Sequence, residues 1–290
     1  MNNYDDILGN KNNRQPFNKE EWSKKKQTDR NEAFKTIDDS TSEVMNSMFT
    51  FEKYLQIQSR FDKYSVGNAM IILAKQPNAT RIKEIDEWKK DGVLFLKGAK
   101  AWNILEQGES YTNEDGTTKH YYDTRTMFDI AQTNANNPTK ESHYDDRLLL
   151  KAFLNECPVD IQTVDNLDSG KMVEWNKENN VLYIQKGSET PQLFYSLTKE
   201  LAKLDFESGN KEIDDFKSYC VSYMICNKYN IDVENYKCNG IPDTLKNLES
   251  KDFRKELESV RSSMKDLNSR VSMYFDTISK EKNKNKDQER

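Results

Sequence analysis

The stretch FDKYSVGNAMIILAKQPNATRIKEIDEWKKDGVLFLKGAKAWNILEQGESY, residues 61–111, opens with a helical pattern and closes with a strand pattern. Its segment AMIILA is apolar on nearly all sides, which predicts a buried helix over residues 67–75. The helix should end before Pro77, because the residue preceding a proline is disfavoured in helical geometry. A short helix carrying Trp88 is expected next, over residues 82–90.

The second part of the same stretch predicts a small antiparallel sheet. From residue 92 the sequence reads VLFL, then a turn at Lys97-Gly98, then AWNIL, which indicates two strands. Further on, Asp115-Gly116 suits the tip of a hairpin because both residue types tolerate positive φ. The segments KHYYD and TMFDI follow that tip as strands, so this part of the chain is expected to be α+β.

An amphipathic helix is expected over residues 41–61, upstream of that stretch. Val44, Met48, Phe51 and Leu55 recur at spacings of four, three and four, which places them on one helix face. Ser40 or Thr41 is the expected N-cap of this helix.

The downstream half predicts a mostly helical unit that ends in one long helix. Phe253, Leu257, Val260, Met264 and Leu267 form an apolar stripe that could receive a partner. The expected elements are helices at residues 144–156, 191–206, 214–229 and 251–279, a further helix capped by Asp243, and one strand at 181–185.

The length of 290 residues favours two domains, and the segment TNANNPTKES has the composition of a linker. The fold class is therefore α+β: a mixed N-terminal domain with a small antiparallel sheet, then a mostly helical domain with a long C-terminal helix. The predicted boundaries are 1–15 (disordered tail), 16–133 (first domain), 134–143 (linker), 144–279 (second domain) and 280–290 (disordered tail).

Composition and charge limit the function. A net charge of -5 argues against coating duplex DNA by bulk electrostatics, although residues 11–30 carry seven basic and three acidic side chains. No signal peptide or membrane-spanning segment is recognisable, which predicts a cytoplasmic protein with no membrane partner. The four cysteines include no CxxC pair and are expected to be free structural thiols.

Three blocks of sequence carry a family resemblance: PFNKEEW at 16–22, the stretch 61–111 quoted above, and TMFDIAQT at 126–133. Together they resemble the N-terminal domain of ArdC-type antirestriction proteins, which bacterial mobile elements carry. The resemblance implies a domain that binds single-stranded DNA.

In that family a zincin-like metallopeptidase domain often follows, and the second half is similar in outline. The resemblance aligns LFYSLTKELAKLDF (193–206) with the HExxH helix, so that Lys199, Glu200 and Lys203 stand at the motif positions, and Tyr219 stands at the third-ligand position. A protonated lysine offers no lone pair to zinc. We therefore expect no metal, no cofactor and no catalytic activity, with Glu200 in a local ion pair, although an active metallopeptidase remains the third alternative.

Other catalytic chemistry finds little support in the residues. His120 and His143 lie far in sequence from the helix at 193–206 and are expected to be structural or superficial. Cys220 and Cys226 lie in an apolar helix, where a thiol behaves as a small hydrophobe. No glycine-rich phosphate-binding motif is present.

Aromatic side chains for base stacking and basic side chains for phosphates both occur in the first domain. A core role for Trp88 and Trp102 is the alternative to stacking, and Asn68 either caps a helix or contacts a base edge. Tyr121 belongs to the same aromatic set. The candidate nucleic-acid-binding residues are Tyr64, Asn68, Arg81, Lys97, Lys100, Trp102, Lys119, Tyr122 and Arg125.

These observations predict a non-enzymatic, single-stranded-DNA-binding or antirestriction-like accessory protein of a conjugative or other mobile element. Its expected partners are single-stranded DNA and a host defence or DNA-transfer protein. The alternative is a protein-interaction module that inhibits a host defence enzyme without binding nucleic acid, with its acidic surface imitating DNA.

Overall fold

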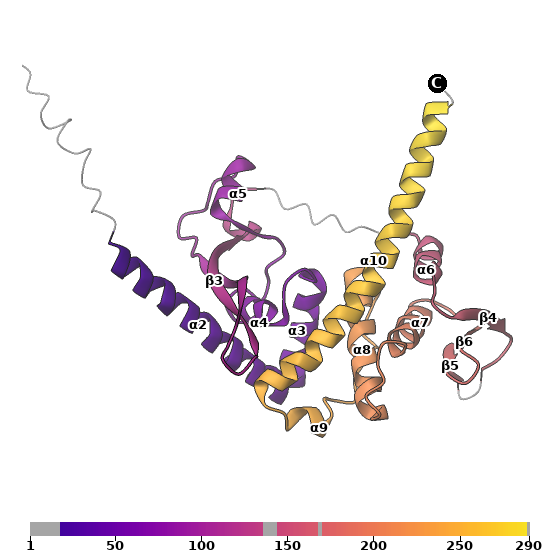
Figure 1. The fold of residues 1–290 in the computed structure, drawn as a ribbon. Helices are drawn as coiled ribbons and strands as arrows, with labels where there is room; N and C mark the ends of the chain where they lie inside the picture. Colours follow the sequence, from indigo (N-terminus) through magenta and orange to yellow (C-terminus); the bar gives the residue numbers. More distant parts are fainter. Residues whose placement is uncertain (1–17, 136–143, 168–169, 289–290) are drawn as a thin grey trace, which may run out of the picture.

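The computed structural model describes residues 18–135, 144–167 and 170–288, and Figure 1 shows how its elements are arranged. The predicted tail at 1–15, most of the predicted linker and His143 lie outside the described residues. Within the described part, no helix is long and apolar enough to cross a bilayer.

Three helices open the described chain: α2 (Lys19–Asn46), α3 (Met48–Arg60) and α4 (Val66–Lys75). The side chains of Asn18, Ser47 and Ser65 accept backbone N–H groups at the three starts. The buried helix predicted over 67–75 is confirmed as α4.

The helix predicted over 41–61 with a cap at Ser40 or Thr41 is wrong in its bounds. Both residues lie inside α2, where they are buried, and the Thr41 hydroxyl donates to the Ile37 carbonyl. The chain breaks at Ser47 instead, whose extended backbone and hydroxyl start α3. Val44, Phe51 and Leu55 are nevertheless fully buried, as their spacing predicts.

The first sheet contains β1 (Ile82–Glu84), β2 (Trp102–Thr112) and β3 (Thr118–Asp129) in the order β1–β3–β2, with both pairings antiparallel. The short helix α5 (Ile85–Lys90) follows β1, and a 3-10 turn (Ile130–Gln132) follows β3. The hairpin tip predicted at Asp115-Gly116 is confirmed, with Gly116 at a φ of 81°.

The strand predicted at VLFL is wrong. This segment is extended but pairs with the chain after β3, where Phe95 forms an isolated bridge with Thr133 and the Leu96 N–H donates to the Gln132 carbonyl. It therefore adds no strand to the sheet, and Leu94 and Leu96 are exposed.

The second half contains α6 (Asp146–Leu154), a sheet, and four further helices. The sheet has the order β4–β6–β5, with β4 (Asp160–Val164) parallel and β5 (Val173–Asn176) antiparallel to β6 (Val181–Gln185). Only β6 was expected from the sequence. The helices are α7 (Gln192–Lys203), α8 (Lys211–Lys228), α9 (Asp243–Lys246), which starts after Pro242 without a side-chain cap from Asp243, and α10 (Ser250–Gln288).

Helix α10 runs along the body of the molecule and packs on α2, α4, α6, α7 and α8 (Figure 1). Its predicted apolar stripe is fully buried in the chain's own core, so that stripe is not open to a partner. The helix also continues to Gln288 through the region predicted to be a disordered tail.

The apolar core is continuous between the two halves of the chain. Phe51 on α3 stacks on Phe216 on α8 with ring centroids 5.4 Å apart, and the Arg254 guanidinium on α10 pairs with Asp38 on α2 at 2.8 Å. The two predicted domains thus share one apolar core.

Candidate functional site

The outer end of the β2–β3 hairpin presents two exposed tyrosines side by side. Tyr111 and Tyr121 have ring centroids 4.5 Å apart, and 36% and 59% of their respective surfaces are exposed. Lys119 pairs directly with Tyr111 across the two strands, so Tyr121, two residues further along β3, is the diagonal neighbour of Tyr111. His120 is exposed between Lys119 and Tyr121.

A β-bulge lies next to these rings, on the side away from the hairpin tip. The register of the ladder shifts between Gln107 and Ser110, and Gly108 lies in this shift. A Cβ at Gly108 would lie 3.4 Å from the Tyr121 carbonyl oxygen, which is an ordinary van der Waals contact. Sequence reasoning included Tyr121 but missed Tyr111. Counting the strand register outward from a two-residue tip at Asp115-Gly116 would have paired Tyr111 with His120, one residue away from its observed partner Lys119.

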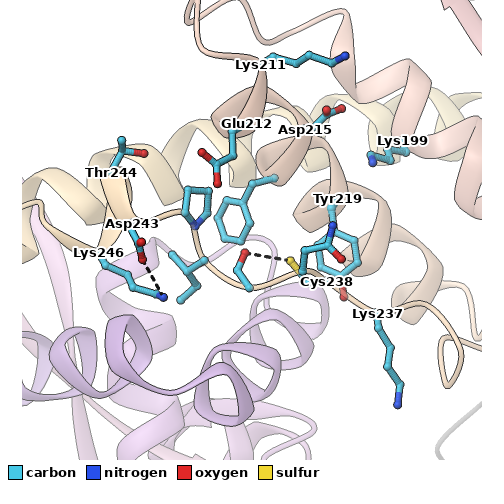
Figure 2. Close-up of a pocket in the computed structure, with 15 residues that line it drawn as sticks. Lys199, Lys211, Glu212, Asp215, Tyr219, Lys237, Cys238, Asp243, Thr244 and Lys246 are labelled. Carbon is cyan, nitrogen blue, oxygen red and sulfur yellow. Dashed lines mark hydrogen bonds and ion pairs between the residues drawn. The ribbon is translucent and has the colours of Figure 1, made fainter.

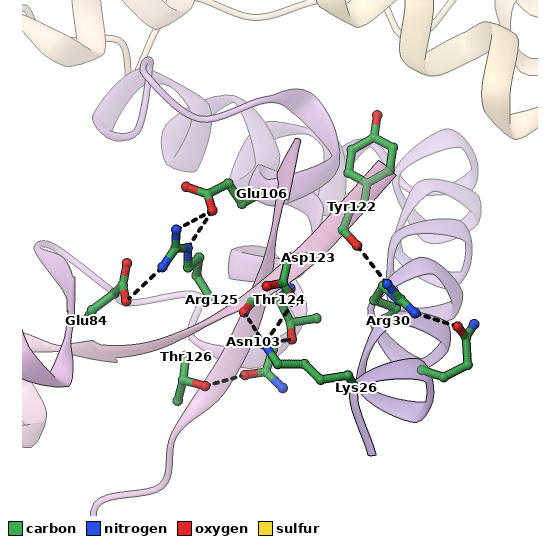
Figure 3. A network of polar contacts seen from close by, with 11 residues as sticks. Lys26, Arg30, Glu84, Asn103, Glu106, Tyr122, Asp123, Thr124, Arg125 and Thr126 are labelled. Carbon is green, nitrogen blue, oxygen red and sulfur yellow. Dashed lines mark hydrogen bonds and ion pairs between the residues drawn. The ribbon is translucent and has the colours of Figure 1, made fainter. Parts of the chain in front are cut away.

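Two basic side chains of helix α2 form hydrogen bonds to β3 (Figure 3). The Lys26 ammonium lies 2.9 Å from the Asp123 carboxylate and also donates to the Thr124 carbonyl, while the Arg30 guanidinium donates to the Tyr122 carbonyl at 3.2 Å. The hydrogen bond from Lys26 lowers the pKa of Asp123. These two basic residues of the N-terminal cluster therefore stabilise the hairpin.

The candidate residues Tyr122 and Arg125 are partly occupied by contacts within the protein. The half-buried Tyr122 ring meets Phe34 of α2 edge-on, with centroids 5.5 Å apart. The Arg125 guanidinium lies 2.6 Å from Glu106 and 3.7 Å from Glu84, and the hydrogen bond to Glu106 raises the pKa of Arg125 (Figure 3). Arg125 is thus neutralised by two carboxylates, which weakens its assignment as a phosphate contact.

Asn68 and Trp102, two of the predicted nucleic-acid contacts, are buried in the structure. The Asn68 side-chain amide donates to the Leu105 carbonyl at 2.8 Å and accepts the Leu105 N–H at 2.9 Å, which ties α4 to β2. Trp102 is 7% exposed and belongs to the core. Trp88 is buried too, and its indole N–H donates to the Phe128 carbonyl. Asn68 and Trp102 are therefore structural, and the core alternative holds for both tryptophans.

The remaining candidates lie apart from one another. Tyr64 is half-buried and meets Phe61 edge-on. Arg81, Lys97 and Lys100 are exposed, the two lysines lying on the loop between α5 and β2. That loop joins the inner end of the hairpin, roughly 30 Å from Lys119 for nine residues of strand at about 3.3 Å each. The exposed basic side chains therefore lie in two separate regions, with Lys97 and Lys100 at the inner end of the hairpin and Lys119 near its tip.

The helix expected to correspond to the metal-binding helix carries a buried ion pair. Glu200 is 7% exposed, and its carboxylate accepts from the Lys203 ammonium at 2.6 Å and from the Trp175 N–H at 3.1 Å. Lys203 also lies 3.5 Å from Asp215 on α8. The predicted ion pair of Glu200 is confirmed, and both its carboxylate oxygens are engaged.

Lys199 and Tyr219, the other two residues aligned with metal-ligand positions, lie near this ion pair. Lys199 lines a cavity between α7, α8 and α9, together with Tyr219. The Tyr219 hydroxyl donates to the Tyr236 carbonyl at 3.2 Å, and burial raises the pKa of Tyr219. Among the described residues, no three His, Cys, Asp or Glu side chains are grouped so as to hold a metal ion.

The cysteines are free thiols, as predicted. Cys220 and Cys226 are fully buried in α8, while Cys157 and Cys238 are half-buried. Burial raises the pKa of Cys226 to about 12, so this group is a neutral thiol at physiological pH. A buried, protonated thiol is a poor nucleophile.

Comparison with known proteins identifies one similar fold. No protein-family model matches the sequence, and no curated protein matches it. The chain is similar in structure to the antirestriction ArdC protein from plasmid R388, whose crystal structures include a metal-free and an Mn(II)-bound form. The TM-scores are 0.47 and 0.48 at 14% sequence identity, over 73% of this chain and 85% and 84% of those chains.

Proposed function

We propose that this chain is a non-enzymatic, antirestriction-type accessory protein of a bacterial mobile element, and that it holds single-stranded DNA on the β2–β3 hairpin within the cytoplasm. The observation that carries the proposal is the exposed pair Tyr111 and Tyr121 beside Lys119. Bases stack on such rings with about 1–3 kcal/mol each, and a neighbouring ammonium contacts the phosphate backbone.

The charge distribution near the hairpin favours single strands over duplex. Glu106 is paired with Arg125, but Asp115, Glu109 and Glu114 are exposed carboxylates on the same hairpin with no ion pair among the described residues. The overall charge of -5 still leaves little bulk attraction for a duplex, in which the bases are stacked on each other. Discrimination then comes from unpaired bases that are free to stack on tyrosine.

The loop that carries Lys97 and Lys100 offers a second contact region. Both side chains are exposed, and among the described residues neither has a carboxylate within ion-pair distance. A strand bound at Tyr111 and Tyr121 would reach this loop only by following the length of the hairpin. Reversing both charges, as K97E/K100E, should therefore weaken binding of longer oligonucleotides more than binding of short ones.

The contacts of α7 support a role without peptide hydrolysis. Lys199 and Lys203 carry ammonium groups, which repel a metal cation. Glu200, the one residue type shared with a metallopeptidase motif, is buried and already accepts two hydrogen bonds. A general base must be able to reach a water molecule, and this carboxylate is occupied.

The test is fluorescence anisotropy of a labelled single-stranded oligonucleotide, with unlabelled duplex as competitor, across a series of salt concentrations. We expect binding that duplex displaces poorly and that weakens as salt rises, with a shallow slope because few phosphates are contacted. Absence of binding at low salt, or equal competition by duplex, would refute the proposal.

A further inference from the structure

A second feature of the molecule is a cavity of about 790 Å³ beside α8, formed with the segment 237–246 (Figure 2). Its apolar side consists of Phe216 and Tyr219 from α8 together with Ile241 and Pro242 from the facing segment, and all four are buried. Small-molecule sites typically measure about 300–1,000 Å³ and combine apolar walls with a few polar groups. The size of this cavity lies in that range, whereas its lining is richer in charged and polar side chains.

The rim of the cavity carries more cations than the described carboxylates neutralise. Its four lysines are Lys199, Lys211, Lys237 and Lys246. Lys246 pairs with Asp243 at 3.3 Å, and Asp215 is 3.5 Å from Lys203, which lies outside the lining. Among the described residues, Lys199, Lys211 and Lys237 have no carboxylate within 4 Å, and Glu212 is the one acidic group of the lining without an ion pair.

Two of these three lysines lie near each other, on either side of Asp215 (Figure 2). In Figure 2, Lys237 points away from the other labelled residues, whereas Lys199 and Lys211 flank Asp215 at the rim. Cys238 also lines the cavity, and because burial raises its pKa it adds no negative charge at neutral pH. The four lysines of the lining exceed its three carboxylates, Glu212, Asp215 and Asp243, by one, and this excess positive charge attracts an anion.

We propose that this cavity binds a phosphate-bearing ligand of nucleotide size, with the phosphate on Lys199 and Lys211 and the remainder of the ligand inside the cavity. Lysine binds phosphate as a compact point charge. A free nucleotide and the terminal phosphate of a DNA strand present the same chemistry. This site lies on other elements than the β2–β3 hairpin and does not depend on the hairpin proposal.

The experiment is isothermal titration calorimetry of the full chain in phosphate-free buffer. Deoxyadenosine monophosphate, deoxyadenosine and inorganic phosphate are titrated separately. We expect the monophosphate to bind more tightly than either of the other two. The double variant K199Q/K211Q should weaken its binding by about tenfold or more, because two charge-assisted contacts are lost. The matched control is K265Q, which removes an exposed lysine of α10 outside the cavity and should leave binding unchanged.

Two outcomes would overturn the proposal. One is no heat from the monophosphate at millimolar concentration, and the other is equal affinity for wild type and K199Q/K211Q. Circular dichroism of both variants checks that they are folded, so that a loss of binding reports on the site.

A pair of oligonucleotides distinguishes the two sources of the phosphate. If the ligand is a DNA end, a 5′-phosphorylated strand binds more tightly than its 5′-hydroxyl counterpart, and K199Q/K211Q removes the difference. If the ligand is a free nucleotide, the two strands bind alike while the monophosphate still binds. The variant Y111A/Y121A separates this proposal from the preceding one, since it should lose oligonucleotide binding and keep monophosphate binding.

Discussion

Replacing Glu200 with glutamine is expected to lower the free energy of unfolding by about 2 kcal/mol. The carboxylate is 7% exposed and accepts from the Lys203 ammonium and the Trp175 N–H. A hydrogen bond to a charged group contributes about 1.5–3 kcal/mol. Glutamine retains one acceptor for the Trp175 N–H but presents only a neutral amide to Lys203. The Lys203 ammonium still has Asp215 as a counter-charge at 3.5 Å.

The assay is thermal unfolding followed by circular dichroism, together with urea titration. A loss of about 2 kcal/mol corresponds to a decrease in Tm of roughly 3 °C for a chain of 290 residues. The control is E207Q, since Glu207 forms an exposed pair with Lys177 that should contribute less than about 1 kcal/mol. If E200Q were as stable as wild type and instead abolished a zinc-dependent peptide hydrolysis, Glu200 would be a catalytic residue and the structural interpretation would be wrong.

Three further outcomes follow from the contacts of the first sheet and of α8. Replacing Trp102 with alanine should destabilise the fold by about 3–5 kcal/mol in urea titration, because a large core side chain is removed; a stable variant with weakened DNA binding would restore its stacking role. Replacing Arg125 with glutamine should change oligonucleotide affinity less than replacing Lys119, since Glu106 already neutralises Arg125; anisotropy with both variants decides, and the reverse order would contradict this. The buried thiol of Cys226, with its pKa raised to about 12, should contribute stability that is constant below about pH 8.5 and lost as pH rises toward 12; a wild-type stability that falls no faster with pH than that of C226A would contradict this.

Much of the fold follows from local sequence patterns. The run AMIILA, the Asp115-Gly116 tip and the apolar stripe of α10 each predict the element that the structure contains. The break between α2 and α3 does not follow, because Ser40, Thr41 and Ser47 are all capable N-caps and packing selects Ser47. Strand β4 was missed because most of its residues are exposed and show no apolar alternation.

The candidate site is less readable from sequence, because exposure depends on tertiary contacts. Nothing in the residue types of Asn68 and Trp102 reveals that one bonds the β2 backbone and the other enters the core. Tyr111 was missed as well, because a two-residue tip at Asp115-Gly116 would pair it with His120, whereas the actual loop pairs it with Lys119. The ion pair of Glu200 with Lys203 was predictable because residues three apart are neighbours on a helix.

The account depends most on the two exposed tyrosines, and the most direct measurement compares single-stranded DNA affinity of wild type with that of Y111A/Y121A. Both rings are exposed, so the variant should remain folded, which its thermal melt verifies. Loss of two stacking contacts predicts a decrease in affinity of at least about thirtyfold at fixed salt, from roughly 1–3 kcal/mol for each base. A folded variant that binds as tightly as wild type would contradict the hairpin as the DNA-binding surface.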